Sequence, residues 1–326
     1  MGEVMDVSLA LDRYDRHFPF FDGTVASPPG LNLRVLQVGQ STTLRDGNSR
    51  HNRMLEGEFD IAEFSMSSFL MAIDRGLPLT GIPVFPRRLF SAGLFFVAAD
   101  SSIQKPADLE GRRVAISSFQ TTLSLLAKGD LKFEYDVPWE SITWVVSAKE
   151  KVAFVPKPGV RIETLPARTD LGLCLKEGKV DAVVAPHPPH SILSGAVRVR
   201  RLFADSQAEE LRYFRKYGYF PIMHILAIRK DLVAREPWLV QAVMGLFADA
   251  HRIAADYYSD PNWSSLVWGR KQFEWEREQL GFDPWVMGVE ENRSNLERMI
   301  AYSVDQGLVR SSLGVADLFP AGLCGH

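Results

Sequence analysis

The sequence has few cysteines, no long apolar run and no excess of positive charge. Its two cysteines, Cys174 and Cys324, stand far apart, which favours two reduced thiols over a disulfide framework. The longest apolar run, residues 94–99, has the length of a strand, whereas crossing a bilayer takes roughly 20 residues. The formal net charge of −3 argues against non-specific nucleic-acid binding. Neither a membrane nor a nucleic acid is therefore an expected partner.

The motifs of several large enzyme classes are also missing. The chain contains no Walker loop, dinucleotide fingerprint, G-x-S-x-G elbow or H-E-x-x-H motif. Residues 1–6 carry two acids and no basic segment, which does not resemble a secretory signal and predicts a cytoplasmic protein. At 326 residues of ordinary globular composition, the chain is long enough for two lobes that share a core. A homo-oligomer is compatible with these observations.

Short apolar segments alternate with patterns of helical period. Strands are expected at residues 7–10, 31–38, 59–64, 94–98, 114–116, 180–185 and 220–228. Helices are expected at residues 48–55, 65–74, 171–177, 237–255 and 292–306, and another begins after residues 117–122. Strand–helix–strand alternation implies parallel crossovers and an α/β fold.

The order of these segments predicts two α/β lobes with a ligand cleft at the hinge. The strand at 94–98 takes the chain into the second lobe, and the strand at 220–228 returns it to the first. We therefore expect lobe one to comprise residues 1–97 and 222–326, and lobe two residues 98–221. Two chain crossings indicate a hinge of paired strands rather than a flexible linker.

Two ionisable residues in apolar, strand-like segments are candidates for catalysis. His224 ends the phrase "YGYFPIMH", where a histidine requires partners for its ring nitrogens. It is either a core histidine bonded to a backbone carbonyl or an acid/base group at the cleft. Glu63, at the end of a predicted strand, suits an acid/base role or a buried structural hydrogen bond equally well.

Two arginines and two groups of polar side chains suit the binding of an anion. Arg87 and Arg88 end a predicted strand, and the planar fork of an arginine matches both oxygens of a carboxylate. Arg88 is the stronger candidate of the two. The alternative is that both are solvated arginines on the surface. Two strand-to-helix turns carry donors that could clamp an anion between helix N-termini, or serve as ordinary caps. These donors are Ser65, Ser67 and Ser68 in the first lobe, and Ser117, Ser118, Gln120, Thr121 and Thr122 in the second.

The remaining histidines are weaker candidates. His187 and His190 have a spacing that raises the question of a metal, but the prolines around them exclude a helix that would align their rings. No cluster of ligand-spaced residues supports a divalent metal, so we expect none, and His187 stays a candidate for substrate contact. His17 and His51 lie in polar segments, and we expect both to face solvent.

Five segments of the chain resemble the 4,5-dihydroxyphthalate decarboxylase family, in register over residues 5–310. They read "FDIAEFSMSSFL", "IPVFPRR", "DLEGRRVAI", "GKVDAVVAP" and "GYFPIMHILAIRKDL", of which the phrases at 82–88 and 220–224 are the most specific. The resemblance implies a type II periplasmic-binding-protein fold adapted to enzyme work.

The resemblance also implies a carboxy-lyase that acts on a dihydroxylated aromatic dicarboxylate without an organic cofactor. Such an enzyme needs a base near the hydroxyl, an acid near the ring carbon and donors for the carboxylate that stays. His224 fits the acid/base role, and Arg88 with the two polar turns fits anion binding. The alternative is a solute-binding or sensor protein of the same fold, for which the same donors suffice.

Overall fold

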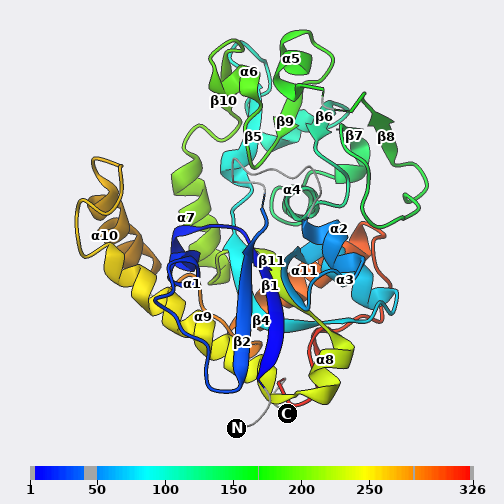
Figure 1. The fold of residues 1–326 in the computed structure, drawn as a ribbon. Helices are drawn as coiled ribbons and strands as arrows, with labels where there is room; N and C mark the ends of the chain where they lie inside the picture. Colours follow the sequence, from blue (N-terminus) through cyan, green and yellow to red (C-terminus); the bar gives the residue numbers. More distant parts are fainter. Residues whose placement is uncertain (1–3, 40–49, 168, 282, 324–326) are drawn as a thin grey trace.

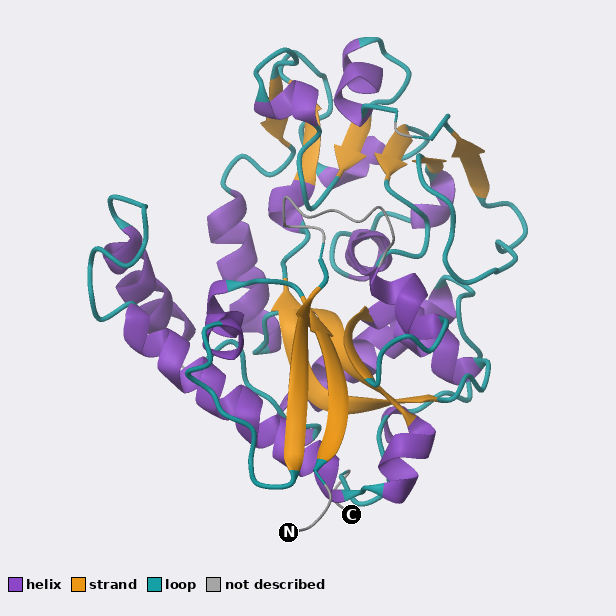
Figure 2. Ribbon diagram, in the orientation of Figure 1, coloured by secondary structure: helices purple, strands orange, loops and turns teal. Residues whose placement is uncertain are grey.

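The computed structural model describes residues 4–39, 50–167, 169–281 and 283–323. In these parts of the chain, two mixed β-sheets lie one above the other with helices around each, as Figure 1 shows. The upper sheet has short strands and the lower sheet longer ones (Figure 2). This is the predicted arrangement of two α/β lobes.

The first sheet has the strand order β2-β1-β3-β11-β4. Its strands are β1 (Met5–Leu11), β2 (Leu31–Gln37), β3 (Ile61–Ser65), β4 (Leu79–Arg88) and β11 (Ile222–Arg229). Strand β1 is parallel to β2 and β3, whereas β11 is antiparallel to β3 and β4. The carboxyl ends of β1, β2 and β3 therefore meet at one edge, which is where open α/β sheets bind ligands.

The second sheet has the strand order β10-β5-β9-β6-β7-β8. Its strands are β5 (Phe95–Ala98), β6 (Arg113–Ile116), β7 (Thr143–Val146), β8 (Arg161–Thr164), β9 (Ala182–Val184) and β10 (Val199–Arg201). As expected from the sequence, this sheet contains parallel pairs: β6 is parallel to both β7 and β9, and β7 is parallel to β8. Strand β5 pairs antiparallel with both β9 and β10 at the opposite side.

The helices surround both sheets. They are α1 (Phe18–Phe21), α2 (Arg50–Leu55), α3 (Met66–Asp74), α4 (Thr122–Phe133), α5 (Leu171–Lys176), α6 (His190–Leu193), α7 (Ser206–Tyr217), α8 (Lys230–Arg235), α9 (Trp238–Tyr257), α10 (Gly269–Leu280) and α11 (Arg293–Asp305). The predicted helices at 65–74, 171–177, 237–255 and 292–306 are confirmed as α3, α5, α9 and α11. The predicted helix at 48–55 is confirmed from Arg50 onward, and its first two residues lie outside the described part.

Two segments carry the chain between the sheets. Residues 89–94 lead from β4 to β5, and residues 218–221 lead from α7 to β11. The backbone N–H of Leu89 donates to the carbonyl of Pro221 at 3.1 Å, so the two crossings run side by side. Strand β5 already belongs to the second sheet, so the first crossing precedes residue 95. The lobe boundaries themselves stay a prediction.

One apolar cluster extends through both lobes. It contains Phe64 of β3, Val114 of β6, Leu125 of α4 and Leu296 of α11, all fully buried. A second cluster lies between the first sheet and α9, and a third between the second sheet and α5. Since the lobes share the largest cluster, moving one lobe away from the other would expose apolar surface.

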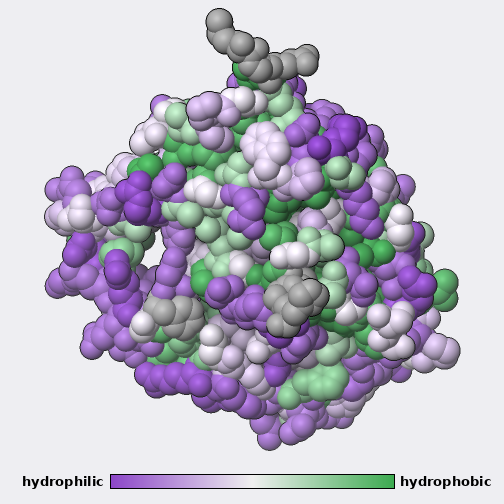
Figure 3. Space-filling view, turned by 90° about the horizontal axis from the view of Figure 1, so that it is seen from below, coloured by the Kyte–Doolittle hydropathy of each residue, from purple (hydrophilic) through white to green (hydrophobic). Residues whose placement is uncertain are grey.

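The surface is mixed in polarity. On the face shown in Figure 3, hydrophilic residues dominate the outline and hydrophobic residues gather toward the middle. The described part of the chain has no helix that is both long and apolar enough to cross a membrane. Cys174 is a buried free thiol in α5, and Cys324 lies outside the described residues.

Candidate active site

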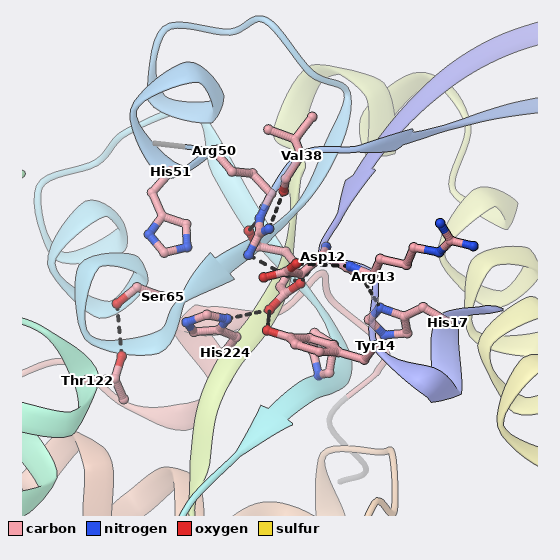
Figure 4. Close-up of polar contacts among 12 residues, drawn as sticks. Asp12, Arg13, Tyr14, His17, Val38, Arg50, His51, Ser65, Thr122 and His224 are labelled. Carbon is pink, nitrogen blue, oxygen red and sulfur yellow. Dashed lines mark hydrogen bonds and ion pairs between the residues drawn. The ribbon is translucent and has the colours of Figure 1, made fainter. Parts of the chain in front are cut away.

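The carboxylate of Glu63, near the end of β3, is the centre of a buried polar cluster. Its partners Asp12, Tyr14, Arg50 and His224 are labelled in Figure 4. It accepts hydrogen bonds from the backbone N–H of Asp12 and the hydroxyl of Tyr14, each at 3.1 Å. The guanidinium of Arg50 forms an ion pair with it at 3.2 Å. Burial alone would raise the pKa of Glu63, but Arg50 and His224 outweigh burial and hold this pKa well below its usual value. Glu63 is therefore a buried anion.

His224, on β11, is bound directly to this anion. Its Nδ1 lies 2.5 Å from Oε1 of Glu63, and an ionised carboxylate can only accept a hydrogen bond. The ring hydrogen is therefore on Nδ1, and Nε2 presents a lone pair. Burial lowers the pKa of His224 to about 4 although Glu63 opposes this shift, so the ring is neutral at pH 7. The two residues that the sequence offered separately as catalytic candidates, Glu63 and His224, are thus in contact.

The register of β11 is irregular at His224. Shifts in strand pairing occur on both sides of this residue, which stands opposite Ser65 of β3 and Arg87 of β4. Bulges of this kind re-aim side chains and are frequent next to active sites. The irregular register explains how a histidine in an apolar strand reaches the end of the neighbouring strand.

A turn after β1 supports the Glu63 anion. His17 lies in this turn, and its Nδ1 is 2.8 Å from the carbonyl of Asp12. The expectation that His17 faces solvent is wrong: it is 1% exposed and packs edge-on against Phe247 of α9. A Cβ on Gly39 would lie 2.1 Å from the Asp12 carboxylate, so this close approach requires glycine.

His51, at the start of α2, is a second imidazole of the cluster. The expectation that it faces solvent is also wrong, because it is 6% exposed. Its ring stands at 89° to that of His224 with the centroids 5.2 Å apart, and it also packs on Phe64. Its Nδ1 lies 2.8 Å from Nζ of Lys151, which belongs to the segment between β7 and β8 of the other lobe. Within the described residues, its buried Nε2 has no hydrogen-bond partner.

The two polar turns predicted to clamp an anion do face each other. The hydroxyls of Ser65 and Thr122 are 2.9 Å apart, and Thr122 also accepts from the backbone N–H of Ser67 at 3.2 Å. The side chain of Ser68 is buried on α3. In the first lobe, the hydroxyl of Ser65 therefore bridges to the second lobe instead of capping its own helix.

The donors of the second turn are engaged within the protein, which corrects the expectation that this turn is open to an anion. The backbone N–H groups of Phe119 and Gln120 donate to the carboxylate of Glu150, at 2.6 and 3.2 Å. The Gln120 amide forms two hydrogen bonds with the backbone of Val152, and Thr121 caps α4 by accepting from Ser124. Ser118 is buried and Ser117 is exposed.

The two arginines at the end of β4 have different surroundings. Arg88 is 2% exposed, and its Nη atoms donate to the carbonyls of Phe220 and Val286 and to Oδ1 of Asn292, at 2.6–2.9 Å. Its fork is thus occupied by protein oxygens, which speaks against the preference for Arg88. Arg87 is half-buried and has no hydrogen bond or ion pair with the described residues.

The last sequence candidate lies elsewhere. His187 is exposed on the segment that follows β9, outside the contacts of Glu63. In the described part of the chain, no group of three or more His, Cys, Asp or Glu residues is placed to hold a metal ion.

Sequence reasoning missed five residues of this cluster: Asp12, Tyr14, Arg50, His51 and Lys151. One available signal was the position of Asp12 and Tyr14 directly after β1, because parallel strands end at the same edge as β3. Arg50 and His51 also lay at the start of a predicted helix near that edge. Lys151 gave no such signal, since it comes from the other lobe.

Known proteins resemble the chain at two levels. It is 30% identical to a 4,5-dihydroxyphthalate decarboxylase of Comamonas testosteroni, over 98% of each chain. It is 27% identical to a protein of the same name from Pseudomonas putida, over 66% of this chain and 83% of that one. A family profile described as NMT1/THI5 like matches residues 39–134.

A solved structure supports the fold. The periplasmic aliphatic sulphonate binding protein SsuA of Escherichia coli superposes with a TM-score of 0.59 at 14% identity, covering 98% of this chain and 94% of that chain. The predicted two-lobed fold of the type II periplasmic-binding-protein class is thereby confirmed.

Proposed function

Because the chain belongs to the 4,5-dihydroxyphthalate decarboxylase family, we propose that it is a carboxy-lyase for a dihydroxylated aromatic dicarboxylate of the 4,5-dihydroxyphthalate type. The observation that carries this proposal is the neutral His224 ring, which a buried anionic Glu63 orients through Nδ1. A ligand-binding role alone does not require a buried, oriented base.

The reaction is a replacement of CO2 by a proton on the ring. Removing the proton of the hydroxyl para to the departing carboxylate creates a phenolate, whose electrons move to the ring carbon that bears this carboxylate. That carbon takes up a proton, its bond to the carboxylate breaks, and the electron pair of this bond restores the aromatic ring. CO2 leaves, the phenolate regains its proton, and one proton is consumed in total. For 4,5-dihydroxyphthalate the product is 3,4-dihydroxybenzoate.

His224 is the base in this scheme. Its Nε2 lone pair faces away from Glu63 and accepts the proton of the hydroxyl, while Nδ1–H stays bonded to Glu63. The imidazolium that forms is stabilised by the carboxylate, whose own charge is held by Arg50 and Tyr14. A buried and fixed carboxylate stabilises this charge more than water would, because it needs no reorganisation.

Arg87 is the residue that we assign to the carboxylate that stays on the ring. It stands opposite His224 in the β4–β11 pairing and has no ion-pair partner among the described residues. Its planar fork matches two carboxylate oxygens. Ser65 pairs with His224 from the other side of β11, so it is the hydroxyl of the predicted binding turns that we place in this site.

The proposal is tested with 4,5-dihydroxyphthalate by following CO2 release and the formation of 3,4-dihydroxybenzoate. We expect turnover by the wild-type protein and a loss of about 10²–10⁴-fold in kcat for His224→Gln. The binding of 3,4-dihydroxybenzoate, measured by thermal stabilisation, should change little. His190→Gln is the matched control because His190 is exposed on α6, and it should behave as wild type.

Two results would contradict the proposal. Full turnover by His224→Gln would exclude this residue as the base. Thermal stabilisation of the wild-type protein by aromatic dicarboxylates without any release of CO2 would favour the solute-binding or sensor function instead.

A further inference from the structure

The proposed reaction needs an acid as well as a base, and the structure contains an unused donor beside His224. That donor is His51, whose buried Nε2 has no partner within the described residues. A buried N–H without a partner costs about 1–3 kcal/mol, so such groups are rare in folded proteins unless something else fills the place. Figure 4 shows the His51 ring directed toward the region of Ser65 and His224.

Lys151 determines which nitrogen of His51 carries the hydrogen. An ammonium group has three donors and no acceptor, so Nζ donates to Nδ1 of His51 across their 2.8 Å contact. The lone pair is then on Nδ1, and the hydrogen of the neutral ring is on Nε2. Burial and the nearby Lys151, His224 and Arg50 lower the pKa of His51 well below its usual value, although Glu63 acts in the opposite direction. The His51 ring is therefore neutral.

The two imidazoles therefore present opposite functions. His224 offers a lone pair at Nε2 because Glu63 holds its Nδ1–H, and His51 offers a hydrogen at Nε2 because Lys151 occupies its Nδ1. The rings are perpendicular, with their centroids 5.2 Å apart. One neutral histidine is arranged to accept a proton and its neighbour to donate one.

We propose that His51 is the general acid of the decarboxylation and that Lys151 resupplies its proton. This inference rests on the proposed function. The Nε2 hydrogen of His51 moves to the ring carbon as the bond to CO2 weakens, and Nδ1 takes a proton from Nζ. His51 remains neutral in this step and Lys151 becomes an uncharged amine. After the product leaves, water supplies one proton to Nε2 while Nδ1 returns its proton to Nζ, which restores the starting state and matches the one proton that the reaction consumes.

Lys151 suits the role of a proton donor. Burial and the nearby Arg50 lower the pKa of Lys151 to about 8, so it is still mainly protonated at pH 7 but releases its proton more readily than an exposed lysine. Because His51 comes from the first lobe and Lys151 from the second, the acid is complete only when the lobes are together. The base, by contrast, lies within the first lobe.

The test separates proton delivery from folding and from binding. In D2O, an enzyme that protonates the ring carbon should also exchange the C6 hydrogen of the product 3,4-dihydroxybenzoate, by the reverse of the same step. We expect His51→Gln to lose at least about 100-fold in kcat and in this exchange, observed by proton NMR. Product binding should remain within a few-fold of wild type.

Lys151→Met is the second variant, with Lys149→Met as its control because Lys149 is exposed on the same segment. We expect Lys151→Met to lose at least about tenfold in kcat, and Lys149→Met to behave as wild type. If His51→Gln fails to fold, Lys151→Met decides the matter.

The outcomes distinguish this inference from the proposed function. If the wild-type protein releases CO2 and His51→Gln shows the same turnover and exchange, the acid assignment is overturned and the decarboxylase proposal stays intact. Lys151→Met takes the place of His51→Gln in this comparison if the latter does not fold. Absence of CO2 release by the wild-type protein would overturn both. Loss of turnover and exchange with retained product binding would support both.

Discussion

At the scale of single residues, the two arginines at the end of β4 show how neighbours in a strand acquire different roles. Successive side chains of a strand point to opposite faces, so Arg87 and Arg88 cannot share an environment. Arg88 is held by oxygens of residues 220, 286 and 292, all distant in sequence, whereas Arg87 stands beside His224. Burial lowers the pKa of Arg88 to about 9.

The two arginines should therefore respond differently to the same substitution. Arg88→Met removes the donor of Asn292 Oδ1 and the charged one of two donors to each of the carbonyls of Phe220 and Val286. We expect the loss of these three charged hydrogen bonds to lower the free energy of unfolding by about 3 kcal/mol. Arg87→Met should leave stability within about 0.5 kcal/mol of wild type. It should weaken the binding of 3,4-dihydroxybenzoate about tenfold or more, because one charged hydrogen bond is worth about 1.5–3 kcal/mol.

Urea unfolding and ligand titration of the two variants measure both effects. The roles would be reversed if Arg88→Met kept the wild-type free energy of unfolding but bound 3,4-dihydroxybenzoate weakly, while Arg87→Met bound it normally.

The residues of the site could be predicted only in part. Glu63 and His224 stood out because charged and imidazole side chains are unusual in apolar strand patterns. Arg88 looked more suitable than Arg87, since the partners that occupy it lie 132 to 204 residues away and leave no local signal. The same is true of Lys151, which reaches His51 from 100 residues away.

At the scale of elements, α4 connects the second lobe to the C-terminal helix α11. Gly129 of α4 faces the ring of Tyr302 in α11, and the hydroxyl of this tyrosine donates to Asp130 at 3.1 Å. The same ring stacks on Phe133 with the centroids 5.3 Å apart. Tyr302 is thus fixed at both ends and cannot easily move away from α4.

Gly129→Ala should destabilise the protein. Glycine to alanine inside a helix normally adds about 1 kcal/mol of stability. Here the new Cβ would lie 2.0 Å from Cδ2 of Tyr302, and overpacking of a fixed core costs about 1–3 kcal/mol or more. We expect the free energy of unfolding to fall by about 2 kcal/mol.

Gly245→Ala in α9 is the matched control for this prediction. Gly245 is also in a helix, but no atom beyond its chain neighbours and its own helix backbone lies within 4 Å of a Cβ placed there. Gly245→Ala should therefore be stabilising by about 0.5–1 kcal/mol in the same urea unfolding experiment. If Gly129→Ala were as stable as Gly245→Ala, the contact between α4 and α11 would not be as tight as described.

Most strands and the long helix α9 were predicted from the sequence, whereas β7, α7, α8 and α10 were not, and neither were the contacts between elements. Apolar patterns gave α9, α11 and β2, in which part of the surface is buried, and the apolar runs α3, β1 and β11, which are buried almost throughout. Two short strands, β8 and β10, lack this signal, since β8 is mostly exposed and β10 has three residues. Glu150 accepts a hydrogen bond from the backbone N–H of Phe119 just before α4, and the sequence around α4 does not predict this contact because it forms only in the folded protein.

At the scale of the whole molecule, the shared core and the buried histidines affect stability together. Urea unfolding followed by tryptophan fluorescence should show one transition, since the largest apolar cluster spans both lobes. The dependence of this transition on pH reflects His17, His51 and His224. Burial lowers the pKa of His17 and of His224 to about 4, and lowers that of His51 well below its usual value.

We expect stability to fall as the pH decreases from 7 to 5. In the unfolded chain each histidine titrates near its ordinary pKa of about 6.5, so the buried neutral ring contributes fully above that pH. The contribution of each buried histidine to the free energy of unfolding is lost as the pH falls from 6.5 toward the pKa of that histidine in the folded protein. The loss amounts to at most about 1.4 kcal/mol per pH unit for each histidine. Asp130 acts in the opposite sense, because burial raises its pKa to about 6 and its contribution is lost as the pH rises from 3.8 toward 6.

Three histidines outweigh one aspartate, so the net loss between pH 6.5 and pH 5 should be on the order of 4 kcal/mol. Urea unfolding at pH 5, 6 and 7 measures this difference directly. His17→Gln tests the cause, because it removes one titrating ring outside the proposed acid and base and should reduce the net loss by about 1.5 kcal/mol. A free energy of unfolding that stays constant or rises as the pH falls to 5 would mean that the histidines are not buried as neutral rings. The same neutrality is what allows His224 to accept a proton and His51 to donate one, so this measurement also bears on both proposals.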